Sequence, residues 1–210
     1  MARLIAARRT AVVPRNGAFA RMGIEDLAAP VLRACLADAG IAPAASIIDV
    51  GGGASTLVDD LLDARFTELS VLDLSGAALA TARDRLGERA QQVCWLEADI
   101  LQARFARHAY DVWHDRATFH FLTEKTQVER YLDTAQNAVS RYLVVGTFSD
   151  TGPRKCSGLD IKQYSEADLE AAFEKVFQKI RCVNEDHETP FQTVQNFTFC
   201  SFTNLKYDEK

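Results

Sequence analysis

The stretch SIIDVGGGASTL, residues 46–57, decides the fold. The apolar and mostly β-branched run at 47–50, interrupted by Asp49, is typical of a parallel strand that is covered on both faces. The three glycines that follow allow positive φ angles and a close approach of the backbone to a ligand. Ser55 or Thr56 can then cap the helix that follows. The stretch therefore predicts a buried strand, a glycine turn and a helix start, which together suit a nucleotide-like cofactor.

The spacing of the glycines bears on the kind of cofactor. The dinucleotide fingerprint is Gly-x-Gly-x-x-Gly, and counted from Gly51 its last position falls on Thr56, so the match is incomplete. Asp49 stands two residues before the first glycine, where a carboxylate can reach a cationic group through the turn. S-adenosylmethionine carries such a group in its amino acid end. The turn therefore favours this cofactor over a dinucleotide.

The composition indicates one soluble domain. At 210 residues with 48% apolar residues, the chain is long enough to bury a substantial core. No apolar run approaches the ~20 residues that a membrane span needs. The formal net charge is −5, and a generally acidic body argues against broad nucleic-acid binding. We therefore expect a soluble protein that binds neither a membrane nor nucleic acid.

The start of the chain differs from the rest. Five arginines precede the first acid, Glu25. Such a basic, acid-free start is compatible with a presequence, but Pro14 and Gly17 break any long amphipathic helix. We therefore predict a basic arm at 1–23, suited to serve as a cofactor lid, and a single domain at 24–210 in the cytoplasm.

The cysteines argue against a disulfide scaffold. They are five in number and form no Cys-x-x-Cys pair, which fits a reducing compartment. No zinc spacing appears, and no metal site is predicted. Two interpretations of the cysteines stay open: they pack as small hydrophobes, or Cys156 and Cys200, with Cys182 or His187, bind a soft metalloid.

Strand and helix patterns alternate along most of the chain. The expected strands are 47–50, 69–73, 93–96, 110–113 and 142–148, and the expected helices are 31–39, ended by Gly40, then 57–62, 75–86 and 128–139. Near the end of the chain, Ser165 and Asp168 resemble a capping box before a further helix. Two strands at 179–184 and 196–203 then pair as a hairpin. This order predicts an α/β fold, with a doubly wound, mostly parallel seven-stranded sheet and an antiparallel C-terminal edge hairpin.

Polar side chains stand at the ends of the predicted parallel strands, where ligands bind in such sheets. Asp49 ends the first strand, Asp73 the second, and Asp99 closely follows the third, while His114, Asp115 and Arg116 follow the fourth. Asp73 lies twenty residues after Gly53, where a carboxylate can accept hydrogen bonds from both ribose hydroxyls. Asp99 can meet the exocyclic amine of adenine.

Four segments in order, IIDVGGGAST, LSVLDLS, LEADI and YDVWHDRATFHFL, resemble the class I methyltransferases that use S-adenosylmethionine. The resemblance covers roughly 46–202. It implies a Rossmann-like fold, S-adenosylmethionine as cofactor and S-adenosylhomocysteine as product. The cofactor-binding residues that it implies are Asp49, Gly51, Gly52, Gly53, Ser55, Asp73, Leu74, Asp99, Ile100 and His114.

The methyl acceptor is less defined by the sequence. The phrase HDRATFHFL, with the later TFSDTGPRKCSGL, resembles a small bacterial subfamily. Asp115-Arg116-Ala117 is similar to a segment of thiopurine-type enzymes, and with Thr118 it approximates the Asp-Lys-Gly-Thr of some lysine methyltransferases. We therefore predict a small-molecule acceptor, with a protein lysine substrate as the alternative. A third hypothesis, cofactor binding without catalysis, arises because 9–22 replaces the aromatic arm of related members.

The candidate catalytic residues are His114, Asp115 and Arg116. A sulfonium methyl is already activated, so the protein mainly aligns an in-line displacement and keeps the pocket dry. A base is needed only for a protonated nucleophile, and His114 or Asp115 could accept that proton. His114 is open to two other interpretations, an orienting group or a strand-end histidine bonded to backbone. We expect His108 and His120 to be structural or solvated.

Overall fold

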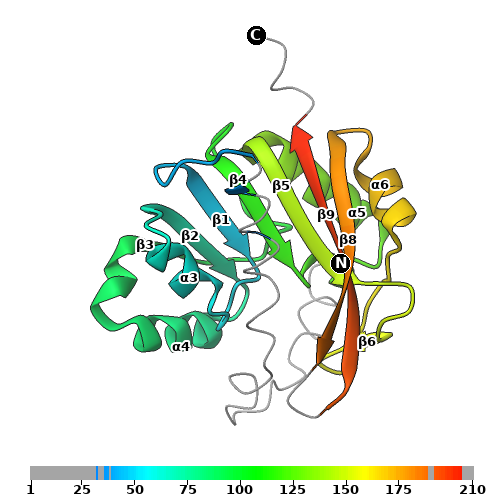
Figure 1. The fold of residues 1–210 in the computed structure, drawn as a ribbon, viewed down its shortest axis with the longest axis horizontal. Coiled ribbons are helices and arrows are strands. Elements are labelled where there is room, and N and C mark those ends of the chain that lie inside the picture. Colours follow the sequence, from blue (N-terminus) through cyan, green and yellow to red (C-terminus); the bar gives the residue numbers. More distant parts are fainter. Residues whose placement is uncertain (1–31, 33–35, 38, 189–191, 205–210) are drawn as a thin grey trace.

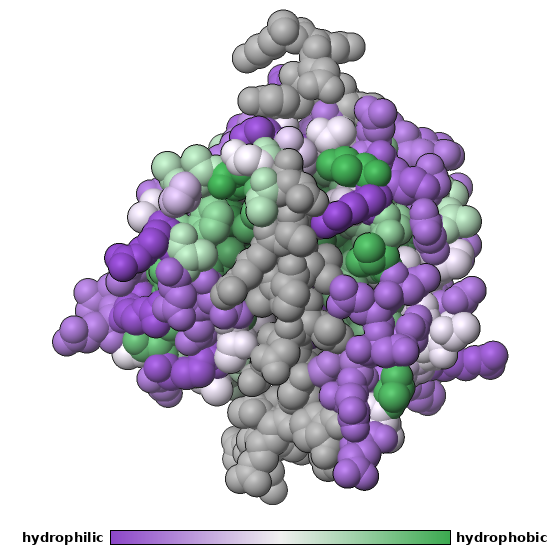
Figure 2. Space-filling model, in the orientation of Figure 1, coloured by the Kyte–Doolittle hydropathy of each residue, from purple (hydrophilic) through white to green (hydrophobic). Residues whose placement is uncertain are grey.

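The computed structural model describes residues 32, 36–37, 39–188 and 192–204. The predicted arm at 1–23 lies outside these residues, as does most of the expected helix at 31–39, of which Leu32, Leu36 and Ala37 are helical. Among the described residues, no helix is long and apolar enough to cross a membrane. On both sides of the grey residues in Figure 2, hydrophilic residues make up much of the coloured surface, with hydrophobic residues among them.

Seven strands form one sheet in the order β3-β2-β1-β4-β5-β9-β8 (Figure 1). Their bounds are β1 Ser46–Val50, β2 Glu68–Asp73, β3 Val93–Glu97, β4 Tyr110–Arg116, β5 Val139–Phe148, β8 Phe177–Glu188 and β9 Val194–Asn204. The first five strands pair in parallel, and β9 is antiparallel to both of its neighbours. The strand order reverses between β1 and β4, which is where a doubly wound sheet opens a crevice for a ligand. The predicted fold class is confirmed.

Helices alternate with most of the strands along the chain, as predicted. They are α3 Leu57–Asp63, α4 Gly76–Leu86, α5 Lys125–Ala138 and α6 Glu166–Phe173, with 3-10 turns η2 Gly87–Gln92 and η3 Phe119–Phe121. The backbone N–H of Ala78 donates to the Ser75 hydroxyl, which caps α4. The predicted capping box of Ser165 and Asp168 is present at the start of α6. At α3 the Thr56 side chain makes no capping bond, and the Leu57 N–H donates to Ser55 Oγ at 3.2 Å.

Two hydrophobic clusters cover the two faces of the sheet. Ile48 and Val50 point to the cluster that includes buried residues of α5 and α6. Ile47 points to the other cluster, which includes residues of α3 and α4. Because side chains alternate between the faces of a strand, both faces of β1 are buried and its apolar run is nearly continuous. The alternation also puts Asp49 on the α3 side.

Some element bounds differ from the predictions. Strand β4 continues to Arg116, so His114, Asp115 and Arg116 lie within the strand rather than after it. Val139, expected in a helix, begins β5. The C-terminal hairpin is longer than predicted, and its first strand, β8, forms the edge while β9 lies inside the sheet. Pairing with neighbouring strands sets these bounds, and the local sequence pattern does not reveal which residues will pair.

A short hairpin that the sequence pattern did not predict follows β5. Strands β6 Lys155–Cys156 and β7 Leu159–Asp160 pair antiparallel. Ser157 and Gly158 between them have φ angles of 51° and 80°. Positive φ at both central residues is the mark of the two-residue turn that matches the twist of a hairpin.

The expectation for the cysteines was wrong in one respect. Cys182 and Cys200 are joined by a disulfide, with their Cα atoms 4.1 Å apart. The cause is the register of the hairpin, which sets the two residues directly opposite each other on β8 and β9. These two sulfurs are therefore not available as thiolate ligands for a metalloid. Cys94 and Cys156 are free, and no metal-binding group of three or more such side chains occurs in the described part of the chain.

Candidate cofactor site

The candidate site lies where the parallel strands end. The arrowheads of β1, β4 and β5 point to the same edge of the sheet in Figure 1. The glycine turn follows β1 at this edge, and the Gly51 N–H donates to the Leu72 carbonyl at 2.7 Å. The strand order thus brings the turn next to the ends of β2 and β4.

The glycine turn has no room for side chains. A Cβ atom at Gly51 would lie 1.7 Å from Thr118 Oγ1, and one at Gly53 would lie 2.8 Å from Asp73 Oδ2. A Cβ at Gly52 would lie 2.3 Å from Asp49 Oδ2. Gly51 and Gly53 also have φ angles of 74° and 45°, which residues other than glycine rarely adopt. Polar atoms at or just after the ends of β1, β2 and β4 therefore crowd the turn and define its path.

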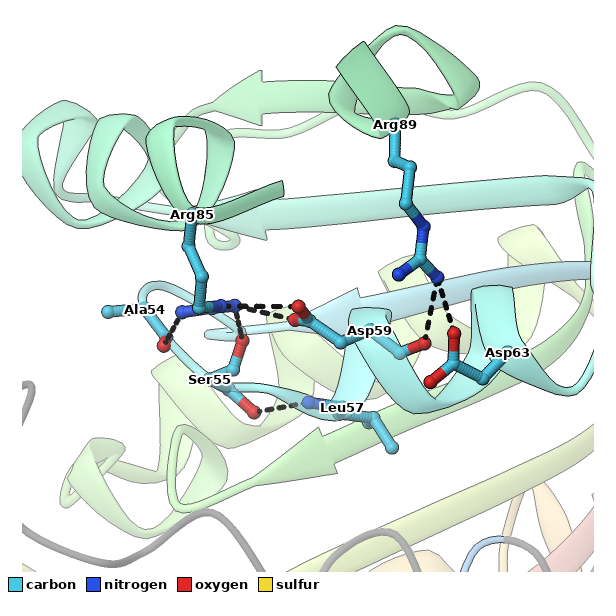
Figure 3. Close-up of polar contacts among 7 residues, drawn as sticks. All are labelled: Ala54, Ser55, Leu57, Asp59, Asp63, Arg85 and Arg89. Atoms are coloured by element: carbon cyan, nitrogen blue, oxygen red, sulfur yellow. Dashed lines mark hydrogen bonds and ion pairs between the residues drawn. The ribbon is translucent and has the colours of Figure 1, made fainter. Parts of the chain in front are cut away.

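An arginine that the sequence analysis missed holds the far end of the turn (Figure 3). Arg85, in the last turn of α4, donates from its guanidinium to three acceptors. They are the carbonyl oxygens of Ala54 at 2.8 Å and Ser55 at 2.7 Å, and the carboxylate of Asp59 at 2.7 Å. Arg89 makes a similar pair with Asp63, at 2.7 Å. These contacts fix the exit of the turn, and the only sequence signal for them was basic residues at the end of a helix.

Asp49 and His114 form a buried pair at the centre of the site. They stand directly opposite each other in the register of β1 and β4. His114 Nδ1 lies 2.8 Å from Asp49 Oδ1, and the two residues are 1% and 4% exposed. Because a carboxylate only accepts hydrogen bonds, Nδ1 is the donor. The other ring nitrogen, Nε2, is buried and has no hydrogen-bond partner among the described residues.

Asp73 lies beside the same turn. Its Oδ1 accepts a hydrogen bond from the Ser75 N–H at 2.7 Å, and its Oδ2 faces Gly53. Burial raises the pKa of the Asp73 carboxyl, with a further contribution from the nearby charge of Asp49. The neighbouring Leu74 is 56% exposed.

Asp99 is engaged with its own turn after β3. Its Oδ1 accepts from the Leu101 N–H at 3.0 Å and its Oδ2 from Gln102 Nε2 at 3.0 Å. The adjacent Ile100 is buried in the core on the α5 side. These polar contacts of Asp99 thus shape the loop that carries Ile100.

Asp115 lies on the opposite face of β4 from His114 and is fully buried. Its Oδ1 accepts from the N–H groups of Thr118 at 2.9 Å and Phe119 at 3.2 Å. Its Oδ2 accepts from the Tyr131 hydroxyl at 2.7 Å, which in turn accepts from Trp113 Nε1 at 2.9 Å. Burial raises the pKa of Asp115 to about 6, although these hydrogen bonds act in the opposite direction. The structure thus surrounds this candidate base with donors from its own fold.

The turn that Asp115 holds also carries Arg116 and Ala117. Ala117 has a φ of 65°, and its N–H donates to the Gly146 carbonyl at 2.8 Å. Arg116 is partly buried, and its charge acts on the Cys156 thiol, whose pKa burial raises. The ends of β4 and β5 and the β6–β7 hairpin therefore meet here.

His120 is buried, in agreement with a structural role. Its ring contacts Phe121 and Phe148, and its Nδ1 accepts from the Phe148 N–H at 3.4 Å. Burial lowers the pKa of His120 to about 3. The imidazole is therefore neutral at neutral pH.

Known proteins share this sequence pattern and this fold. A family model described as a methyltransferase domain matches residues 47–141. The eEF1A lysine and N-terminal methyltransferase of Mus musculus is 28% identical over 108 residues, which are 50% of this chain. The match spans only 16% of the length of that relative.

Several solved structures have a similar fold. The N-methyltransferase NodS of Bradyrhizobium japonicum WM9, in complex with S-adenosyl-L-homocysteine, gives a TM-score of 0.66 at 20% identity, with 84% of each chain covered. Magnesium protoporphyrin IX methyltransferase of Synechocystis PCC 6803, with bound SAM, gives 0.63 at 19% identity, covering 84% of this chain and 77% of that chain. The 1,6-didemethyltoxoflavin-N1-methyltransferase of Burkholderia thailandensis gives 0.68 at 15% identity, covering 86% and 79%. The family model thus describes residues 47–141 as similar to a methyltransferase domain, and these solved structures show that the chain has the Rossmann-like fold of such enzymes.

Proposed function

We propose that this protein transfers the methyl group of S-adenosylmethionine to a small-molecule nucleophile. The observation that carries the proposal is the joint placement of the crowded glycine turn, the Asp49–His114 pair and Asp73 at one edge of the sheet. The buried His114 Nε2 lacks a partner among the described residues, and a cofactor donor would supply one. The residues present therefore fit this cofactor.

Each part of the cofactor has a candidate contact. We assign the amino acid end to the glycine turn with Asp49 and His114, and the ribose hydroxyls to Asp73 Oδ2, which lies beside Gly53. The exposed Leu74 offers an apolar surface to adenine, with Asp99 and Ile100 in the next loop. When bound, S-adenosylmethionine supplies a methyl group on a positively charged sulfur.

The protein's contribution to chemistry is mainly alignment. Arg85 and the crowded turn hold the cradle before any ligand arrives, and preorganised positioning is what an activated methyl donor requires. The contacts of Asp115 favour a role in shaping the β4–η3 turn, because both of its oxygens already accept hydrogen bonds. Arg116, beside the Cys156 hairpin, is the candidate that we assign to the acceptor side.

A protein lysine substrate is the second candidate. It is favoured by the 28% identity to the eEF1A lysine and N-terminal methyltransferase of mouse and by the segment Asp115-Arg116-Ala117-Thr118. A cytoplasmic location is part of our proposal, and the Cys182–Cys200 disulfide would then be exposed to reducing conditions.

The test is a transfer experiment with S-adenosylmethionine that carries an isotopically labelled methyl group. The protein is incubated with a cell extract separated into metabolites and proteins, and both fractions are profiled for label. We expect label in one or a few metabolites. Label confined to a protein band would favour the second candidate, and no label in either fraction would contradict both.

Two glycine variants provide matched controls for that experiment. Gly51→Val introduces a side chain against Thr118, whereas Gly87→Val meets no atom within 4 Å of its Cβ at a similar φ of 57°. Both variants carry the strain of a positive φ. Label that depends on the cradle disappears with Gly51→Val and persists with Gly87→Val.

A further inference from the structure

We propose that two copies of this chain associate through the outer edge of β8, with the two edge strands antiparallel. Strand β8 ends the seven-stranded sheet, and among the described residues only β9 pairs with it (Figure 1). An open strand edge presents backbone N–H and C=O groups that can bind a further strand. Strands β5 and β9 lie between β8 and β4, so this edge is not part of the candidate cofactor site.

The register of the hairpin shows which backbone groups point to the open edge. Cys182 and Cys200 lie directly opposite each other, with their Cα atoms 4.1 Å apart. Opposite residues of antiparallel strands come this close where they exchange no backbone hydrogen bonds, at about 4.5 Å, rather than where they do, at about 5.5 Å. The N–H and C=O of Cys182 therefore point away from β9, and the same alternation applies to Asn184 and Asp186.

Side-chain bonds hold this part of β8 to β9. Three alternate cross-strand pairs on one face of the hairpin are joined in this way. They are Cys182–Cys200 by the disulfide, Asn184–Thr198 at 2.8 Å and Asp186–Asn196 at 2.6 Å. A strand that is already fixed loses little conformational freedom when a further strand pairs with it. The open edge is therefore preorganised for pairing.

The opposite face of the same segment carries Arg181, Val183 and Glu185, in the order basic, apolar, acidic. Arg181 is exposed, Val183 is 37% exposed and Glu185 is half-buried. In the reverse direction the order becomes acidic, apolar, basic. In a twofold dimer, residue i of one copy contacts residue j of the other, and j contacts i. The segment is therefore complementary in charge to a second copy of itself.

One register of the two edge strands satisfies both the charges and the backbone. With Val183 opposite the partner's Val183, Arg181 lies opposite the partner's Glu185, and Glu185 opposite the partner's Arg181. The same register sets Cys182 opposite the partner's Asn184, so the outward backbone groups of the two copies meet. A shift by two residues would keep backbone pairing but set Glu185 opposite the partner's Val183, and both charge pairs would be lost.

A bulge limits the length of the pairing. The register between β8 and β9 shifts between Lys179 and Arg181, and Lys179 forms ion pairs with Glu166 and Glu170 of α6. A bulge increases the local twist and interrupts the ladder, and natural sheets use bulges to protect their edges. Here the protection ends before Arg181, and 181–185 stays open. Because so short a ladder buries little surface, the dimer should dissociate on dilution.

The experiment is sedimentation velocity of the full chain over a range of protein concentrations. We expect a monomer–dimer equilibrium for the wild type. In Arg181→Glu both charge pairs become acid–acid pairs, so the dissociation constant of the dimer should rise roughly tenfold or more. Glu185→Arg creates two base–base pairs and should have the same effect. The matched control is Arg130→Glu, at an exposed position of α5, which changes the net charge as Arg181→Glu does and should leave the dissociation constant within about twofold.

Combinations of these variants test the register itself. An equimolar mixture of Arg181→Glu and Glu185→Arg should form a mixed dimer with about the wild-type dissociation constant, because each introduced charge then faces the opposite charge on the partner. A chain that carries both substitutions should likewise associate with itself. Neither restoration is expected if the single variants had simply failed to fold.

Three results would overturn the inference. In the first, the wild type stays monomeric at every concentration, so the edge does not bind a second copy. In the second, Arg181→Glu and Arg130→Glu change the dissociation constant equally or not at all, which would place any dimer contact on another surface. In the third, the single variants weaken the dimer but neither the mixture nor the double variant restores it, which would rule out this register.

Discussion

Asp49 and Asp115 are both buried carboxylates near the ends of the central strands, yet the fold treats them in opposite ways. Asp49 pairs with a histidine whose second nitrogen has no partner among the described residues. Asp115, on the other face of β4, accepts from Tyr131 and from two backbone N–H groups. The difference suggests a rule for this site. A buried acid whose contacts are completed by its own fold shapes the structure, and one whose partner still lacks a hydrogen bond is prepared for a ligand.

The largest expected effect is on stability at Asp115. Asp115→Ala leaves the Tyr131 hydroxyl and two backbone N–H groups without their acceptor. We expect the free energy of unfolding to fall by about 4 kcal/mol at pH 7, measured by urea denaturation. Asp49→Ala breaks the one hydrogen bond to His114 and should lower the free energy of unfolding by about half as much. Equal losses in the two variants would remove the distinction between these acids.

The next effect concerns the glycine turn. Gly51→Ala would bring a methyl group to within 1.7 Å of Thr118 Oγ1 unless the turn shifts. We expect a loss of about 3 kcal/mol in S-adenosylhomocysteine binding, roughly a hundredfold in Kd. Gly87→Ala also places a side chain at a positive φ, but in open space, and it should bind normally. If both variants bind alike, the crowding around the turn plays no part in cofactor affinity.

The raised pKa of Asp115 predicts a pH dependence of stability. Its value is about 6 in the folded protein, against the ordinary 3.8. The folded state therefore binds the Asp115 proton more tightly than the unfolded state does, and this difference stabilises the fold at low pH. The stabilisation is fully present below pH 3.8 and is lost as the pH rises through 6. Relative to Asp115→Asn, the wild type should lose about 2–3 kcal/mol of unfolding free energy between pH 4 and 7.

The comparison with Asp115→Asn removes an opposing contribution. Burial lowers the pKa of His120 to about 3. Its contribution to the free energy of unfolding is therefore present above pH 6.5 and is lost as the pH falls. Both proteins contain His120, and its contribution cancels in the difference. Parallel pH profiles for the wild type and Asp115→Asn would contradict the assignment of a raised pKa to Asp115.

The smallest effect is expected at Asp73. Asp73→Asn should lower affinity for S-adenosylhomocysteine by about 1.5 kcal/mol, because one strong acceptor for the ribose is lost. It should weaken the binding of 5′-methylthioadenosine, which keeps the ribose but lacks the amino acid end, to the same extent. A selective effect on S-adenosylhomocysteine would place Asp73 at the amino acid end instead.

Local patterns were enough to predict most of the fold. The apolar runs at 47–50 and 142–148 and the alternation of strands with helices led to a doubly wound sheet, and the capping box at Ser165 located α6. These signals could be recognised in the sequence because hydrophobic periodicity and helix capping depend only on residues within one element. The positions of the acids at the strand ends could be predicted from the same strand assignments.

Contacts between distant segments could not be predicted in this way. Asp49 and His114 are 65 residues apart, and their pairing depends on β4 lying beside β1. The disulfide between Cys182 and Cys200 depends on the hairpin register. Asp115 looked like a candidate base because nothing near it in sequence revealed the hydroxyl of Tyr131, which comes from α5. Strand order and helix packing supply this information, and a single segment does not contain it.

The most direct test of the account is a crystal structure of the protein with S-adenosylhomocysteine. We predict that the ligand lies in the glycine turn, with its amino acid end at the Asp49–His114 pair and its ribose at Asp73, while the contacts of Asp115 stay unchanged. A ligand bound away from residues 49–53, or with its ribose away from Asp73, would contradict it.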